Sequence, residues 1–364
     1  MTNNTAGTGS TTDPAPNDPR AVGSAPQGSP AAYEDRVLGC LLGTMAGDAY
    51  GLLSAAGDDP LPALADPSDV AVSDATQLTL YTVDGLTDAL EWANDGVAAD
   101  ETACLWLAYL RWLMRQGEHL PPRAPAPPAR WLDRQEDLLP VHDPDADTVR
   151  ALLTGEMGTR ARPLNPDAEG AGAVMRSAPF GLVPRIPASL VERLTLEAAA
   201  LTHGAAAARA TAALYSGIIR SLAIDGLSLE DAVAAERGEE QQLAKGTGRD
   251  AARAVAEGAP AHRAPADRTG AGTTAAATLE AALQAARAGA AAASPRDQFA
   301  AALAHAAGAG RPDASPVVAA SLAGGILGAL HGTIALPPAY LDAPGAAGVV
   351  RSMARTLLKA TTGS

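Results

Sequence analysis

Apolar residues recur at helical spacing through most of the chain after its first 32 residues. In residues 36–51, RVLGCLLGTMAGDAYG, an interval of four separates Val37, Leu41 and Met45. One face of a helix would carry all three side chains, so the pattern predicts a helix packed in a core. Ser73 precedes a second run of this kind, and we expect it to cap that helix, because a serine side chain accepts a hydrogen bond from the free N–H groups of the first turn.

The same spacing predicts further helices, whereas no stretch alternates between apolar and polar residues over a convincing length. The sequence therefore favours an all-α fold. After the second helix, helical runs are expected around residues 105–113, over 189–223 and over 227–257, followed by two or three alanine-rich helices at the end of the chain.

Other segments interrupt this pattern. Residues 1–32 are rich in Thr, Asn, Gly, Pro, Ala and Ser, and their apolar surface is too small to offset the entropy lost on ordering, so we expect a disordered N-terminal tail. Residues 119–147, with many prolines, and residues 164–184, with several glycines, are expected to be irregular. Residues 258–272 are of low complexity, which predicts a flexible linker within one helical domain of residues 33–364.

Composition narrows the kind of core. Hydrophobic residues make up 47% of the chain but aromatic residues only 3%, so the helices must pack mainly through Ala, Leu and Val. Alanine is the strongest helix former and loses no side-chain entropy, which supports the all-α expectation. The nearly uncharged residues 316–336 come closest to a membrane span. Their many Ala and Gly residues and His331 favour a buried helix instead, and no membrane partner is expected.

Net charge and cysteine content indicate which binding partners and which cellular compartment to expect. The formal net charge of −14 repels phosphate backbones, so nucleic acid is not an expected partner. Cys40 and Cys104 lie in apolar helical patterns without the spacing of a zinc site, and no signal peptide is visible. Free thiols in a reducing cytoplasm are the simplest interpretation.

Four sequence blocks resemble the ADP-ribosylglycohydrolase family, whose members are all-helical enzymes that remove ADP-ribose from modified side chains or related conjugates. The blocks are RVLGCLLGTMAGDAYG (36–51), SDATQLTLYTVDGL (73–86), GAGAVMRSAPFGLVP (170–184) and ALTHGAAAARATAAL (200–214), with a weaker fifth, SLAGGILGALHGTIALP (321–337). The third block is the most specific. The resemblance implies an orthogonal helical bundle with a single large core.

The resemblance also implies where metal ions would bind, and there this chain departs from the family. Family members hold two magnesium ions with a Thr/Ser-Asp-Asp-Thr run and an Asp-Thr/Ser-Asp run, because these hard cations need oxygen ligands and negative charge. Here the first run reads Ser73, Asp74, Ala75 and Thr76, and the second falls on Ser315, Pro316 and Val317, with Asp313 just upstream. Ser73, Asp74, Asp313 and Ser315 would be the remnant of the metal site. We expect no cofactor, with magnesium needed only if hydrolysis survives.

The family binds the diphosphate of ADP-ribose with backbone N–H groups of a glycine-rich loop, which needs small residues for close approach. Gly170, Ala171 and Gly172 keep that smallness, Met175 follows them, and His203 matches a histidine near the ligand. The resemblance therefore implies that these five residues bind the ligand. The alternatives are that the loop is only a turn and that His203 is a structural residue of the core. No residue is assigned a catalytic role.

Three functions remain open. The loss of oxygen ligands at both metal runs favours a degenerate family member that binds ADP-ribose, a related nucleotide ligand or an ADP-ribosylated protein, with weak or no hydrolysis. The alternative is an active metal-dependent hydrolase that uses Asp74, Asp313 and further acids. The third is a structural or interaction scaffold that needs no ligand.

Overall fold

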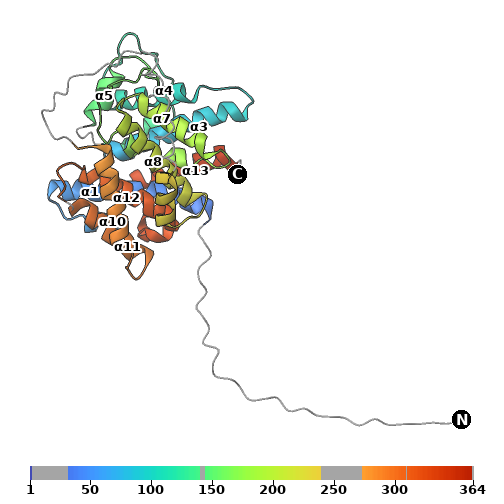
Figure 1. Cartoon of the computed structure of the whole chain (residues 1–364), viewed down its shortest axis with the longest axis vertical. Coiled ribbons are helices and arrows are strands. Elements are labelled where there is room, and N and C mark those ends of the chain that lie inside the picture. Colours follow the sequence, from blue (N-terminus) through green and yellow to red (C-terminus); the bar gives the residue numbers. More distant parts are fainter. Residues whose placement is uncertain (2–31, 140–143, 239–272, 309, 363–364) are drawn as a thin grey trace, which may run out of the picture. The chain divides into compact units, whose positions relative to one another are not determined.

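A computed structural model describes residue 1 and residues 32–139, 144–238, 273–308 and 310–362. Residues 2–31 and 239–272, which hold nearly all of the expected tail and the whole expected linker, lie outside the described residues. The described residues from 32 onward cluster into one compact unit. The described residues form helices and no strand, so the all-α expectation is confirmed (Figure 1).

Most expected helices are present, with additional short ones between them. Residues 229–238 are helical as well, within the expected run 227–257. The α-helices are α1 (Tyr33–Ala56), α2 (Leu61–Ala65), α3 (Asp74–Asn94), α4 (Glu101–Arg115), α5 (Ala146–Leu152), α6 (Ala178–Gly181), α7 (Ala188–Ala200), α8 (Ala206–Ala223), α10 (Ala275–Ala288), α11 (Pro295–Gly308), α12 (Pro316–His331) and α13 (Ala346–Thr362), and the 3-10 helices are η1 (Leu132–Arg134), η2 (Glu136–Leu138), η3 (Val174–Arg176), η4 (Gly332–Ala335) and η5 (Pro338–Leu341).

Helices α1 and α12 pack against each other within one continuous apolar core (Figure 1). A Cβ atom on Gly43 would lie 2.2 Å from the Gly324 carbonyl oxygen, and one on Gly39 would lie 2.6 Å from that of Gly328. The two backbones therefore touch, as small residues at such spacing allow. Both segments are long and apolar enough to cross a membrane, but 78% of the apolar window in α1 and 67% of that in residues 316–335 are buried within the structure. The expected buried helix is confirmed over residues 316–331, and a 3-10 helix follows it to Ala335.

The start of α3 is fixed by a buried carboxylate of α1. Ser73 caps α3 as expected, with its Oγ accepting a hydrogen bond from the N–H of Ala75 at 3.0 Å. Asp48 accepts hydrogen bonds from the N–H groups of Ser73 and Thr76 at 2.8 and 3.2 Å, and from both hydroxyls at 2.5 Å. Burial raises the pKa of the Asp48 carboxyl, and these hydrogen bonds oppose that shift. Asp48 thus satisfies donors that the first helical turn leaves free, and it holds Asp74 in place.

The segments expected to be irregular contain short helices that the sequence did not reveal. Ion pairs fasten residues 119–139 to α3 and α4: Arg130 Nε lies 3.0 Å from Asp84 of α3, and Asp133 Oδ2 lies 3.4 Å from Arg111 Nε of α4. Beyond this segment, Asp145 caps α5, with its Oδ2 accepting a hydrogen bond from the N–H of Thr148 at 2.8 Å. Among the described residues after 272, four α-helices, α10 to α13, are present where two or three were expected, and Gly345, at a φ of 71°, forms the turn before α13.

Candidate functional site

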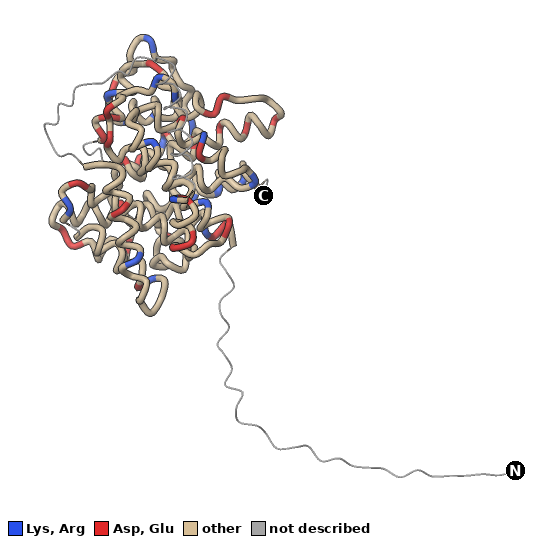
Figure 2. Tube along the Cα trace, in the orientation of Figure 1, with Lys and Arg blue, Asp and Glu red and all other residues tan. Residues whose placement is uncertain are grey.

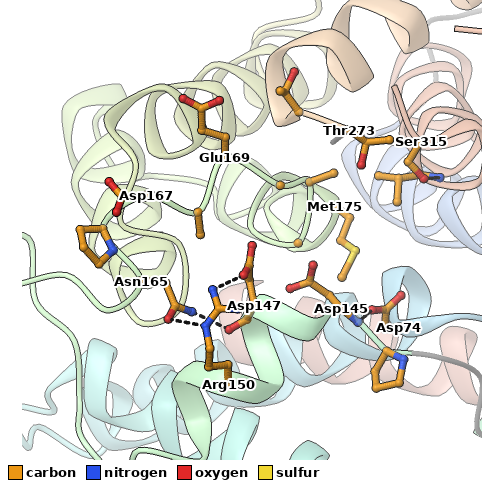
Figure 3. A pocket seen from close by; sticks show the side chains of 18 residues that line it. Asp74, Asp145, Asp147, Arg150, Asn165, Asp167, Glu169, Met175, Thr273 and Ser315 are labelled. Carbon is orange, nitrogen blue, oxygen red and sulfur yellow. Dashed lines mark hydrogen bonds and ion pairs between the residues drawn. The ribbon is translucent and has the colours of Figure 1, made fainter. Parts of the chain in front are cut away.

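A cavity of about 770 Å³ opens where several segments distant in sequence meet. This volume is typical of pockets that hold a small organic ligand, roughly 300–1,000 Å³. Its walls come from Asp74 at the start of α3, from α5 and the two residues before it, from residues 165–172 with Met175, from residues 273–274, and from the start of α12 (Figure 3). The cavity can therefore exist only in the folded chain.

Most of the residues suggested by the family resemblance lie at this cavity. The lining includes Gly170, Ala171, Gly172 and Met175 from the glycine-rich loop and Asp74 and Ser315 from the two metal runs. Ser73 is not part of the lining, because its side chain is bound to Asp48 and caps α3. Asp313 is also outside the lining, and its carboxylate pairs with Arg311 at 3.2 Å. Asp74 and Ser315, one residue from each of the two sequence runs that bind metal in the family, thus lie together at the cavity, whereas Ser73 and Asp313 do not.

Four carboxylates that the sequence analysis did not single out also line the cavity. They are Asp145, Asp147, Asp167 and Glu169, and Arg150 is the only basic residue in the described lining. Charged residues of both signs are otherwise interspersed along the described trace (Figure 2), so this concentration of acids is local. Among the described residues, no three His, Cys, Asp or Glu side chains are grouped so that they could hold a metal ion.

Asp145 connects the start of α3 with the start of α5. Its backbone N–H donates to Asp74 Oδ2 at 2.7 Å, while its own Oδ2 accepts from the N–H of Thr148. Figure 3 shows Asp74, Asp145 and Asp147 along one wall of the cavity. The sequence did contain a signal for this helix start, since an Asp followed by a second acid before a helical run is typical of an N-terminus. Because of the prolines nearby, residues 119–147 were instead predicted to be irregular.

His203 lies behind the glycine-rich loop and is fully buried. Its Nε2 is 3.4 Å from Asp145 Oδ2, too poorly aligned for a regular hydrogen bond, and its Nδ1 is 2.8 Å from the hydroxyl oxygen of Thr202. That oxygen accepts a hydrogen bond from Arg176 at 2.6 Å. Burial lowers the pKa of His203, and Arg176 lowers it further, while Asp145 raises it. The ring is therefore neutral near pH 7.

The hydrogen-bond network assigns the proton of that neutral ring. Because Arg176 can only donate, the Thr202 oxygen is an acceptor toward it and keeps its own hydrogen for Nδ1 of His203. The remaining proton then lies on Nε2 and faces the carboxylate of Asp145, whereas the other tautomer would set a lone pair against that carboxylate. Arg176 itself is buried over the ring of Tyr109, 4.3 Å from the ring centre, which agrees with a structural role.

The glycine-rich loop lines the cavity with residues whose backbone N–H groups have no partner in the described part of the chain. The backbone N–H groups of Gly170, Ala171 and Gly172 donate no hydrogen bond to any residue that the structure describes. Successive unpaired N–H groups in a loop of small residues attract anionic groups such as phosphates. A loop of this kind could accept an anionic group.

Asn165 anchors the segment that leads into this loop. Its φ of 46° is in the left-handed region, which asparagine tolerates better than most residues. Its side-chain N–H₂ donates to the carbonyl groups of Asp147 at 2.7 Å and Thr202 at 2.9 Å, and its Oδ1 accepts from Arg150 at 3.1 Å (Figure 3). The sequence analysis missed this residue, although the Asn-Pro pair marks a turn.

The comparisons with known proteins agree with this architecture. A family model described as ADP-ribosylglycohydrolase matches residues 29–364. Among solved structures, a chain of an "ADP-ribosylglycohydrolase-related protein complex" is 22% identical, covers 90% of this chain and 99% of its own, and gives a TM-score of 0.51. That likeness supports the fold alone, and a search of curated proteins found no matching sequence. Because the family model spans the whole helical unit, the chain belongs to the ADP-ribosylglycohydrolase family.

Proposed function

We propose that the cavity binds ADP-ribose or a closely related nucleotide ligand and that this chain hydrolyses ADP-ribosyl bonds weakly or not at all. The observation that carries the proposal is that the glycine-rich loop keeps its small residues and free N–H groups at the cavity, among the described residues, while the set of metal ligands is incomplete. Gly170, Ala171 and Gly172 line a cavity of suitable size, and their N–H groups have no partner among the described residues. No group of described acids is arranged to hold a metal ion.

The side chains at the two metal runs do not fit a pair of magnesium ions. Ala75, Pro316 and Val317 offer no side-chain oxygen. Ser73 is committed to Asp48, and Asp313 to Arg311. Two of the additional acids are also engaged, since one oxygen of Asp145 caps α5 and Asp147 pairs with Arg150. Two adjacent divalent cations need several free oxygens to offset their mutual repulsion, and these residues do not supply them.

The remaining residues divide the recognition of ADP-ribose between them. The loop N–H groups would meet the diphosphate, with Arg150 the nearest source of positive charge in the described lining. Carboxylate oxygens can accept hydrogen bonds from ribose hydroxyls, and Met175 and Val318 offer apolar contact. An ADP-ribosylated protein that presents the same group is the proposed macromolecular partner. Neither nucleic acid nor a membrane is proposed as a partner.

Isothermal titration calorimetry tests the proposal. ADP-ribose should bind equally well in buffer with EDTA and in buffer with magnesium, and magnesium alone should give no binding heat. Adenosine, which lacks the diphosphate, serves as the control ligand and should bind more weakly. Absence of ADP-ribose binding, or tight binding of magnesium, would overturn the proposal.

The second candidate is an active hydrolase, and the acids along one wall of the cavity favour it. Asp74, Asp145 and Asp147 all line the pocket, which is more negative charge than the two metal runs alone suggested. Release of ADP-ribose from peptides modified on arginine or serine would establish this activity, provided that it depends on magnesium and is lost in Asp74→Ala. A scaffold without a ligand would instead show no change in thermal stability with ADP-ribose.

A cytoplasmic location remains part of the proposal. Cys40 and Cys104 are free in the structure, with Cys40 buried and Cys104 half-buried. Burial raises the pKa of the Cys104 thiol to about 11. Thiols that stay protonated and unpaired suit a reducing compartment.

A further inference from the structure

We propose that Asp145 is the member of the Asp145–His203 pair that contacts a ribose hydroxyl of the ligand, and that His203 is a positioning residue that holds the Asp145 carboxylate against the glycine-rich loop. The inference rests on the proposed function, since it names the contact that a ribose-containing ligand would make in this cavity. It assigns Asp145 a role that neither metal run suggests.

Accessibility separates the two residues. The Asp145 side chain keeps 20% of its surface exposed and lines the cavity, whereas that of His203 keeps none and lies outside the lining. A ligand in the cavity can therefore touch the carboxylate without any rearrangement. The imidazole is reached only through Asp145 or through the loop itself.

The two oxygens of Asp145 have different tasks. Oδ2 accepts the N–H of Thr148 and faces Nε2 of His203. Oδ1 accepts no hydrogen bond from any described residue, so it is available to a donor in the cavity. A carboxylate oxygen of this kind commonly accepts a hydrogen bond from a ribose hydroxyl. Oδ1 is the atom that would make this contact.

A chain of donors leads from the core to this carboxylate. Arg176 donates to Thr202, the Thr202 hydroxyl donates to Nδ1 of His203, and the proton left on Nε2 faces Asp145. Each step fixes the orientation of the next group. The last contact, at 3.4 Å, is long and poorly aligned, which is frequent for functional hydrogen bonds in sites without ligand.

The glycine at position 172 provides independent support. A Cβ atom there would lie 2.4 Å from Asp145 Oδ2 and 2.6 Å from His203 Cε1. The side of Gly172 on which a Cβ would stand thus faces the pair, so the absence of a side chain is what admits the carboxylate and the imidazole beneath the loop. The sequence suggested that a small residue here lets a ligand approach the backbone, but in the structure it makes room for Asp145 and His203.

Four variants test the assignment by titration with ADP-ribose. Asp145→Ser keeps a good helix cap for α5 but removes the carboxylate, and we expect affinity to fall at least tenfold. His203→Ala should cause a similar loss, while His203→Gln, whose amide N–H can replace Nε2–H, should stay within threefold of the original protein. Adding His203→Ala to Asp145→Ser should lower the affinity for ADP-ribose no further than Asp145→Ser alone, because the two residues act through one contact.

Several outcomes would overturn the assignment. If the losses from Asp145→Ser and His203→Ala multiply, or if His203→Gln binds as weakly as His203→Ala, His203 contacts the ligand itself. Should His203→Ala fail to fold, Asp145→Ser and His203→Gln still decide between the two roles.

A measurement without ligand keeps this inference separable from the proposed function. Nitrogen-15 NMR of the histidine rings should show His203 protonated on Nε2, with that proton signal shifted in Asp145→Ser. A proton on Nδ1 would overturn the positioning role whether or not ADP-ribose binds. If the Nε2 signal is as expected and the original protein binds no ADP-ribose, the proposed function and the ribose contact fail, while the positioning of Asp145 by His203 stands.

Discussion

At Gly172 the difference between a hydrogen atom and a methyl group decides whether two side chains fit beneath the loop. A Cβ atom there would meet Asp145 Oδ2 at 2.4 Å and His203 Cε1 at 2.6 Å, whereas one on Gly170 would meet its nearest neighbour, Asp147 Oδ2, at 3.5 Å. The first distances lie far inside van der Waals contact, and the last is ordinary contact. Two glycines of the same motif therefore carry different constraints.

Gly172→Ala should destabilise the protein and Gly170→Ala should not. The added methyl group must displace Asp145 or the fully buried His203, and such overpacking costs about 1–3 kcal/mol. Urea denaturation of both variants measures the free energy of unfolding, and Gly170→Ala is the matched control. Equal stability of the two variants would show that the loop moves freely away from the pair.

The burial of His203 also predicts how stability depends on pH. Because burial lowers its pKa in the folded protein, the unfolded chain binds a proton at about pH 6.5 that the folded chain does not. The free energy of unfolding should therefore decrease as the pH falls from about 6.5 toward the lower folded value. His203→Gln should lose less stability than the original protein between pH 7.5 and 5.5 in urea denaturation.

His331 provides the internal control for that comparison. Burial lowers its pKa as well, and it is present in both proteins, so their difference isolates His203. Identical pH dependence of the two proteins would contradict the prediction.

Only some residues of the candidate site could be predicted from the sequence. The glycine-rich loop and Asp74 were identified because short motifs carry them. Asp145, Arg150 and Asn165 were missed, because their roles depend on contacts between segments that the sequence does not show to be neighbours. His203 was identified, but a motif cannot tell whether a histidine faces a ligand or a second side chain.

Among the elements, the contact of α1 with α12 sets the strictest packing requirement. Gly43 and Gly324 face each other so closely that a Cβ on either would lie 2.2 or 2.0 Å from the carbonyl oxygen of the other. Backbone atoms on both sides leave no flexible side chain to move aside. The two helices would have to separate to accept a methyl group, and both belong to the central core.

Gly43→Ala should therefore cost at least about 3 kcal/mol of unfolding free energy, at the upper end of overpacking effects. Gly348→Ala in α13 is the matched control, since a Cβ there would meet nothing nearer than 3.7 Å. The higher helix propensity of alanine should then raise stability by about 0.5–1 kcal/mol. Thermal and chemical denaturation of both variants measure the difference, and a Gly43→Ala protein of unchanged stability would show that α1 and α12 are less tightly packed than described.

The fold was more predictable than the site, and the failures have physical causes. Strong apolar periodicity identified α1, α3 and α4. The five-residue α2 and seven-residue α5 were missed, because so short a helix shows hardly two turns of any period and is stabilised by its caps and contacts. The separation of α7 from α8 at residues 201–205 is likewise set by packing, since a Cβ on Gly204 would lie 2.6 Å from Pro166 Cα.

At the scale of the whole molecule, negative charge around the cavity repels the diphosphate that the N–H groups of the loop would attract. Among the described residues, five carboxylates and one guanidinium line it, and the chain as a whole carries a net charge of −14. A diphosphate entering this field is repelled over distances that salt can screen, because the Debye length falls from about 10 Å at 0.1 M to about 3 Å at 1 M salt. The N–H groups of the loop act by direct contact and are less affected.

ADP-ribose should consequently stabilise the folded protein, and more strongly in 0.5 M than in 0.05 M sodium chloride. The cavity is assembled from α3, α5, α12 and the loop, so the unfolded chain has no such site, and a ligand at a hundred times its Kd adds about 2.7 kcal/mol to the free energy of unfolding. Thermal unfolding with EDTA present measures this as a rise in Tm. Adenosine is the control, because without phosphates its effect should not depend on salt. A Tm increase with ADP-ribose that shrinks as salt is added would mean that attraction to Arg150 or to a bound cation outweighs the carboxylates.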